Sequence, residues 1–345
     1  MTALTADDRV LAGRRWSLRY SRRAALVCGI LSAVLLLLLI AALMIGEYLV
    51  TPQALVRTLL GDPPARLDGF FVLGRRLPRA LVAIVVGASL AVAGAVFQTL
   101  TRNPLASPDV IGISSGASVG AVTVFLVWGG SLDQAAIGAV VGAVAIAGII
   151  VLLTARTGLH GAQLILTGVA LSAIAMAVVD YVLTQVFVAS ATTAQTWLIG
   201  SLQGRGWSDL LPAAITLVVV AIVLAWTAPD ARMLALGDGM STGLGVRTAR
   251  TRWTLLAAAT VLVAIAVATA GPISFVALVA PHIARRIAGV TSFLASGLVG
   301  ALLLLASDLV ALNVFPAPIP VGAVTITLGG GFFLWLLWRE GARRG

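Results

Sequence analysis

Lysine is absent from this chain of 345 residues, and all 23 basic residues are arginine. A phosphate-binding P-loop needs the lysine of G-x-x-x-x-G-K-[ST] to reach the β- and γ-phosphates of a nucleotide. The chain therefore contains no such loop. If ATP supplies energy to this protein, another polypeptide must hydrolyse it.

Cysteine and histidine are almost as scarce. Cys28 is the single cysteine, and His160 and His282 are the only histidines. One thiol forms no disulfide within the chain, and two distant imidazoles do not make a typical metal-ligand set. We expect neither a metal site nor a bound cofactor in this chain.

Charge is also rare, since only 10% of the residues are charged, whereas 60% are hydrophobic and the mean hydropathy is +1.06. This composition is typical of a protein that crosses the membrane several times, because about 20 apolar helical residues span a bilayer core. The sequence predicts an all-α polytopic membrane protein with about ten spans. They lie near 24–46, 80–100, 113–130, 135–155, 163–187, 210–228, 253–270, 273–288, 292–312 and 321–338. The first run is longer than the apolar core of a signal peptide, so we interpret it as a retained span.

The arginines predict the orientation. With ten spans and an inner N-terminus, 17 arginines lie inside and 6 outside, as the positive-inside rule favours. Both termini are then cytoplasmic, with an N-terminal segment at 1–23, one transmembrane domain at 24–338 and a tail at 339–345. The net charge of +10 is explained by this topology and by attraction of arginine to the lipid bilayer. It therefore indicates no nucleic-acid partner.

Polar residues and helix breakers interrupt the apolar pattern between Thr101 and Gly120, "TRNPLASPDVIGISSGASVG". Asn103 and Pro104 are typical of a tight inner turn, and Gly112 and Gly116 of a close packing face. Ser114 completes a G-x-S-x-G match. The nucleophile elbow of hydrolases needs a strand, a turn and a His–acid pair around that serine, which this helical setting does not offer.

Six other places carry polar groups whose role the residues alone leave open. The outward Arg75, Arg76 and Arg79 either anchor a span end or dock an acidic partner. Asp180 and Asp308, each inside a span, either line a pathway or bond to neighbouring helices. The remaining places are a short inner loop around His160, a long inner loop at 229–252 and a Pro281–His282 pair inside the eighth span. The 229–252 loop is either an interfacial helix or a short helix pair that binds a cytoplasmic partner.

Several segments in order resemble the FecCD-type permeases, which are membrane subunits of ABC importers for iron–siderophores, haem and cobalamin. The resemblance covers about 75–338 through "RLPR", "GASLAVAGAVFQTLTRNPLASPDVIGISSGAS", "LILTGVALSA", "MLALGD", "GPISFVALVAPHIAR" and "IPVGAVTITLGG". It implies a passive subunit that moves its cargo by alternating access. The implied partners are a second permease chain, two cytoplasmic ATPase subunits that bind ATP and Mg²⁺, and an extracytoplasmic substrate-binding protein. The implied cargo is a ferric siderophore.

The resemblance also implies roles for particular residues. It places binding-protein docking at Arg75, Arg76 and Arg79, and the cytoplasmic gate at His160, Gly161 and Ala162. The fifth span, with Asp180 and Gln185, would line the pathway, and the 101–120 stretch would be architectural, as would Pro281 and His282. The implied ATPase coupling residues are Leu234, Ala235, Leu236, Gly237, Asp238, Leu244 and Gly245.

The chain departs from the family pattern at four positions. Gly239 and Gly243 weaken the coupling segment as a helix by about 1 kcal/mol each. Leu312 and Pro318 stand where many relatives carry charged docking residues, which is compatible with an asymmetric, heterodimeric permease.

Two other classes of function compete with the ABC permease. An ion-coupled secondary transporter would use Asp180 or Asp308 as its proton carrier. An intramembrane hydrolase would lose its activity in Ser114→Ala. A permease would keep uptake in that variant.

Overall fold

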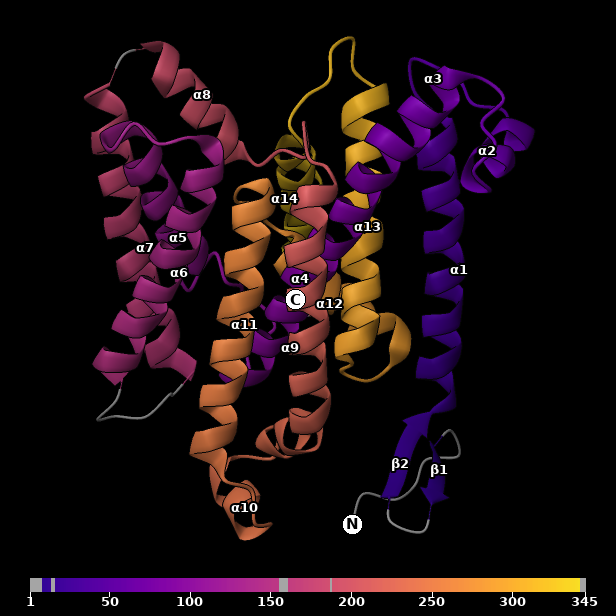
Figure 1. The fold of residues 1–345 in the computed structure, drawn as a ribbon. Helices are drawn as coiled ribbons and strands as arrows, with labels where there is room; N and C mark the ends of the chain where they lie inside the picture. The colour runs from indigo at the N-terminus through magenta and orange to yellow at the C-terminus, as the bar shows by residue number, and fades with distance from the viewer. Residues whose placement is uncertain (1–7, 14–15, 155–160, 187, 342–345) are drawn as a thin grey trace.

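The computed structural model describes residues 8–13, 16–154, 161–186 and 188–341, and it is a bundle of membrane-length helices (Figure 1). Seven helices are long and apolar enough to cross a membrane. Among the described residues there are also two shorter apolar helices, and α12 lies where the sequence predicts a further span. These helices are α1 (Arg22–Met44), α4 (Leu77–Thr101), α5 with η2 (Ile113–Val122 and Thr123–Val127), α6 (Leu132–Thr154), α7 (Gly161–Thr184), α9 (Trp207–Leu234), α11 (Thr248–Ala270), α12 (Val276–Ala288), α13 (Phe293–Asn313) and α14 (Val321–Gly341).

The predicted all-α polytopic class is confirmed, and the helix count fits the predicted ten spans approximately. A two-stranded antiparallel hairpin, β1 (Asp8–Gly13) and β2 (Trp16–Ser21), precedes α1 and lies outside the bundle. Ser21 caps α1 by accepting a hydrogen bond from the backbone N–H of Ala24, which satisfies one of the free donors at that helix end. The first span therefore begins at Arg22.

Short helices lie at the end opposite this hairpin (Figure 1). They are α2 (Pro52–Leu59), α3 (Arg66–Gly69) and α8 (Val188–Ile199), and none of them is long enough to span. The sequence analysis did not predict these helices. At the hairpin end lies α10 (Asp238–Gly243), between α9 and α11.

The second span is longer than predicted, because one continuous helical stretch runs from Arg66 to Thr101. The prediction treated the residues before position 80 as an outward segment. The structure forms α3, the π-helical turn η1 (Phe70–Arg76) and α4 without a break. Pro78 has no N–H to donate to the preceding turn, and a π-bulge is a common way for a helix to accommodate such a disruption.

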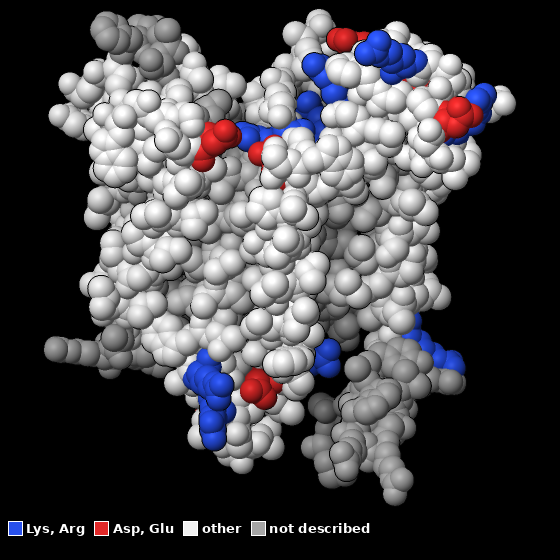
Figure 2. Space-filling view, viewed as in Figure 1, with Lys and Arg blue, Asp and Glu red and all other residues white. Residues whose placement is uncertain are grey.

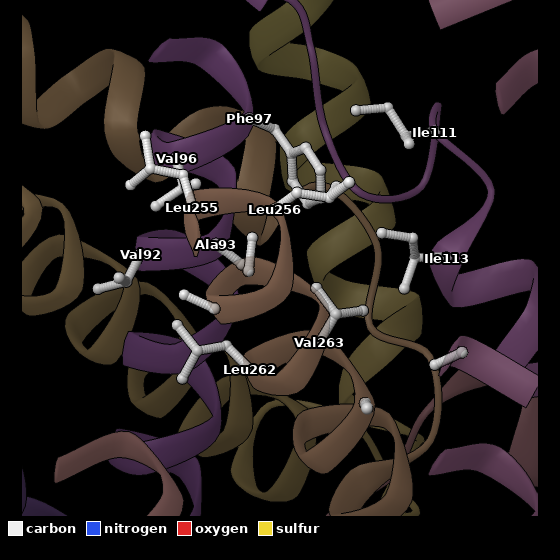
Figure 3. Packing of buried hydrophobic residues seen from close by; sticks show 14 of the residues in the cluster. Val92, Ala93, Val96, Phe97, Ile111, Ile113, Leu255, Leu256, Leu262 and Val263 are labelled. Carbon is white, nitrogen blue, oxygen red and sulfur yellow. The ribbon is translucent and has the colours of Figure 1, made fainter. Parts of the chain in front are cut away.

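The core surrounds α4, which packs against α9, α11, α12 and α13. Figure 3 shows part of the largest apolar cluster, in which Phe97 of α4 meets side chains of α11 and of the 102–113 region. The buried residues labelled there are Val92, Ala93, Val96, Phe97, Ile111, Ile113, Leu255, Leu256, Leu262 and Val263.

Glycines bring α4 close to its neighbours. A Cβ on Gly94 would overlap the carbonyl of Ala277 in α12, and one on Gly87 would overlap that of Gly300 in α13. Such close approach gives van der Waals contact between helices, which is a main source of attraction where lipid surrounds them. The same arrangement joins α5 to α6 through Gly116, Gly120, Gly138 and Gly142.

Candidate functional site

The two ends of the molecule differ in where their charged side chains lie, and Figure 2 shows arginine at both ends with an apolar surface between them. The inner end carries α10 and the arginines around it, and the outer end carries those of α2, α3 and η1. The middle band matches the hydrocarbon region of a bilayer. Candidate sites therefore fall into an outer group, an inner group and the helices between them.

The structure separates the three outward arginines into different environments. Arg75 is exposed, and its guanidinium lies 5.2 Å from the ring centroid of Phe70. Arg76 is partly buried and donates hydrogen bonds to the backbone carbonyls of Leu43 and Tyr48. Docking by Arg75 stays a prediction. Docking by Arg76 also stays a prediction, and its contacts join the end of α1 and the α1–α2 connection to η1.

Arg79 forms an ion pair with Asp308 of α13. Its Nε and Nη2 donate to the two carboxylate oxygens at 2.9 and 2.7 Å, and the side chains are only 18% and 4% exposed. Two parallel charge-assisted hydrogen bonds satisfy the buried carboxylate. Of the two interpretations left open for Asp308, the structure shows the bond to a neighbouring helix.

Tyr48 lies in the connection after α1, where its hydroxyl donates to the carboxylate of Asp68 at 3.0 Å. This hydrogen bond is the main reason why the pKa of Tyr48 is raised above its ordinary value, and burial adds to the shift. The backbone N–H of Ala65 donates to the same carboxylate. Asp68 thus fixes the start of α3.

The inner loop is shorter than predicted. The prediction placed it at 229–252, but α9 continues through Pro229 to Leu234, and α11 already begins at Thr248. The apolar pattern of α9 extends beyond this proline, so packing outweighs the hydrogen bond that Pro229 cannot donate. Residues 235–247 connect the two helices and contain α10.

The predicted coupling residues lie in two environments at this inner end. Leu234 is buried at the end of α9, whereas Leu236, Met240 and Leu244 are 56%, 62% and 57% exposed. Gly237 and Gly245 have φ angles of +99° and +85°, which a side chain would strain, and they begin and end the turn that carries α10. The connection therefore presents three large apolar side chains to the aqueous side.

Asp238 at the start of α10 faces two arginines. Its Oδ1 accepts from Nη2 of Arg102 at 2.7 Å and from Nη2 of Arg252 at 2.6 Å. Arg102 follows α4 directly, and its Nε also donates to the carbonyl of Leu234 at 3.1 Å. Sequence reasoning did not identify either arginine. The scarcity of acidic residues was a signal. The chain has only 13 of them, and each one that lies near the membrane needs a partner.

The 102–112 segment lies partly inside the protein, with its buried residues in the second half. Asn103 Oδ1 accepts from the N–H of Leu105, which closes the turn beside Pro104. Ala106, Ser107 and Ile111 are buried, so protein covers this irregular backbone, as a membrane environment requires. Gly112 has a φ of +84° and approaches the carbonyl of Gly168 in α7.

Asp109 joins this segment to two helix starts. Its carboxylate accepts from the Ser114 hydroxyl at 2.7 Å and from the backbone N–H of Phe275. Ser114 begins the first turn of α5, and Phe275 caps α12 with a φ of +69°. Helix starts carry partial positive charge, so this carboxylate stabilises both of them. Ser114 acts structurally here as a donor to Asp109.

The predicted gate and pathway residues lie on or next to α7. His160 falls outside the described residues, Gly161 is the first residue of α7, and Ala162 is exposed. Asp180 and Gln185 are exposed near the other end of this helix, where Gln185 Nε2 donates to the Thr184 hydroxyl at 3.3 Å. This face of α7 has no cover from the described part of the chain.

Pro281 and His282 lie within α12. Pro281 is buried, and the His282 ring meets Phe332 of α14 edge to face, with 5.7 Å between the ring centroids. The pair therefore lies where α12 contacts α14.

Comparison with known proteins gives one consistent result. The model of the FecCD transport family matches residues 34–339. The ferric enterobactin permease FepG of Escherichia coli is 38% identical over 94% of this chain and 99% of its own length. The vitamin B12 permease BtuC of Vibrio cholerae is 37% identical over 93% of this chain and 95% of its own. A solved metal-chelate type ABC transporter, in an inward-facing conformation, superposes with a TM-score of 0.83 and 28% identity, over 91% of this chain and 99% of that one.

Proposed function

Because this chain belongs to the FecCD transport family, it is a permease subunit of an ABC importer in the bacterial inner membrane, and we propose that its cargo is a ferric siderophore. Support for the cargo comes from the ferric enterobactin permease and the metal-chelate transporter to which the chain is similar. Its similarity to a vitamin B12 permease is nearly as high, so the experiment must include both cargoes.

Energy for this transport comes, in our proposal, from two cytoplasmic ATPase subunits that bind ATP and Mg²⁺. The absence of lysine supports this assignment, since the chain has no P-loop of its own. The exposed Leu236, Met240 and Leu244 would enter an apolar groove on the ATPase. This mode resembles other helix-in-groove interfaces, where a few apolar side chains carry most of the affinity.

The other partners follow from the remaining exposed surfaces. A second permease chain would cover the open face of α7, which places Asp180 and Gln185 beside a shared pathway. The residues at the inner end of α7, with Ala162, would narrow this pathway at the cytoplasmic side. An acidic surface of the extracytoplasmic binding protein would meet Arg75. Pairs of this exposed type steer association more than they add affinity.

The observation that carries the proposal is the family match over residues 34–339, together with the exposed apolar side chains of the 235–247 connection. An ion-coupled transporter is not favoured, and Asp308 is already paired with Arg79. Asp180 is exposed, as a residue beside a pathway between two chains would be.

The test is cellular uptake of iron-loaded siderophore and of cobalamin by cells that lack their own copy of this gene. We expect the intact chain to restore siderophore uptake, vanadate to abolish it, and Met240→Glu to reduce it at least tenfold because a charge would enter an apolar groove. Thr242→Ser, a conservative change at another exposed residue of α10, is the matched control. Uptake of cobalamin alone would contradict the cargo, and collapse by a protonophore without effect of vanadate would contradict the ATP-driven mechanism.

A further inference from the structure

The connection at 235–247 is flexible by composition. Gly237, Gly239, Gly243 and Gly245 lie within it, and a Cβ on any of them would meet no other atom within 4 Å. Glycine gives the backbone conformational freedom, and α10 has only six residues. A partner that pushes on α10 would bend such a connection unless something fixes it to the membrane helices.

Asp238 fixes α10 to the membrane helices. Its carboxylate joins α10 to Arg102 after α4 and to Arg252 in the first turns of α11, at 2.7 and 2.6 Å. We call Arg102, Asp238 and Arg252 the inner triad. Arg252 is 11% exposed, whereas Arg102 and Asp238 are 41% and 46% exposed, and Arg102 also donates to the carbonyl of Leu234. Two arginines on one carboxylate make a stronger junction than a single surface ion pair, which contributes little.

Arg102 connects the triad to the protein interior. It is one of two residues with positive φ that are not glycine in the described chain, at +52°, and residues 103–112 follow it directly. This segment ends in Asp109 and Gly112, which contact the starts of α5 and α12 and the backbone of α7. A displacement of Arg102 therefore acts on three helices.

We propose that the inner triad transmits movement of α10 to the membrane helices, with Asp238 as the positioning residue of this link. The inference rests on the proposed function, because the movement originates in an ATPase bound to α10. It goes further in separating two roles within the 235–247 connection. Leu236, Met240 and Leu244 face the partner, whereas Asp238 faces the protein's own arginines.

The test uses the complex of this chain with its ATPase and second permease subunit, purified and reconstituted in liposomes with binding protein. The variants are Asp238→Asn and Arg102→Gln, alone and together, with Asp238→Glu as the conservative change. Arg250→Gln is the matched control, because Arg250 is exposed on the same first turns of α11 and outside the triad. Three quantities are measured: cargo moved per ATP hydrolysed, retention of the ATPase on the permease, and hydrogen–deuterium exchange of residues 235–247.

We expect Asp238→Asn and Arg102→Gln to lower cargo per ATP about fivefold and to raise exchange at 235–247 about fivefold. The double variant should match Asp238→Asn, because that change already removes the carboxylate to which Arg102 donates. Asp238→Glu should recover most of the coupling, and Arg250→Gln should behave as the unchanged chain.

Three results would overturn the proposal. The first is unchanged hydrogen–deuterium exchange at 235–247 in the variants, and the second is unchanged cargo per ATP despite faster exchange. The third is release of the ATPase in parallel with lost transport, which would place Asp238 in the docking surface. Failure of the proposed function is seen separately, because the unchanged complex would then show no ATP-dependent uptake. The exchange measurement tests the triad even in that case.

Discussion

The pair of Arg79 and Asp308 shows how a rare charge is tolerated near the membrane core. Both side chains lie within helices of spanning length, and the carboxylate is 4% exposed. Removal of two charges from water costs several kcal/mol each, and their attraction offsets this cost only when geometry and hydrogen bonding are good. The two hydrogen bonds between them meet that condition.

We predict that Asp308→Ala lowers the free energy of unfolding by about 3–5 kcal/mol, because Arg79 is left buried without its counter-charge. Arg79→Leu with Asp308→Leu should recover most of this loss, since no uncompensated charge remains. Thermal unfolding of the purified protein in detergent measures both. Asp62→Asn is the control, as its pair with Arg57 is largely exposed and should change stability by less than about 1 kcal/mol. Equal destabilisation in the single and double variants would contradict the assignment.

At the scale of elements, small residues decide which helices touch. The α5–α6 contact depends on facing glycines: a Cβ on Gly120 would overlap the carbonyl of Gly138, and one on Gly142 would overlap that of Gly116. Both helices are apolar on all sides, so hydrophobicity alone selects no face. The positions of the glycines therefore determine how α5 and α6 meet. Gly112 and Ser115 in turn contact α7 and fix its place beside α5.

We predict that Gly120→Ala lowers the free energy of unfolding by about 1–3 kcal/mol, because the added methyl group forces α5 away from α6. Gly148→Ala on α6 is the matched control. A Cβ there meets nothing within 4 Å, and alanine favours helix by up to about 1 kcal/mol, so stability should stay equal or rise. Thermal unfolding in detergent measures both variants. A smaller loss of stability in Gly120→Ala than in Gly148→Ala would contradict this packing argument.

For the whole molecule, the orientation in the membrane is predicted from the arginine distribution, with 17 arginines inside and 6 outside. In a Cys28→Ser background the chain has no thiol, so single cysteines report sidedness. We predict that Leu60→Cys, at the end of α2, reacts with a membrane-impermeant maleimide in intact spheroplasts, because residue 60 is 80% exposed on the outer side. Met240→Cys should react only after the membrane is permeabilised. Labelling of position 240 in sealed spheroplasts would reverse the topology.

The sequence alone determined the class, and it predicts about ten spans and the side on which each end lies. These properties depend on hydrophobic length and arginine distribution, which need no knowledge of which helices touch. The order of motifs also identified the family. The sequence placed the loop at 229–252 too broadly, since a proline is a weak boundary when apolar residues continue beyond it.

Only the tertiary structure decided what the polar residues do. Asp308 is 229 positions from Arg79, and Asp238 is 136 positions from Arg102, so no local pattern links either pair. Arg75, Arg76 and Arg79 look alike in sequence but lie against a phenylalanine ring, two backbone carbonyls and a carboxylate. The sequence gives the type of each charge, whereas the partner of each charge depends on which helices pack together.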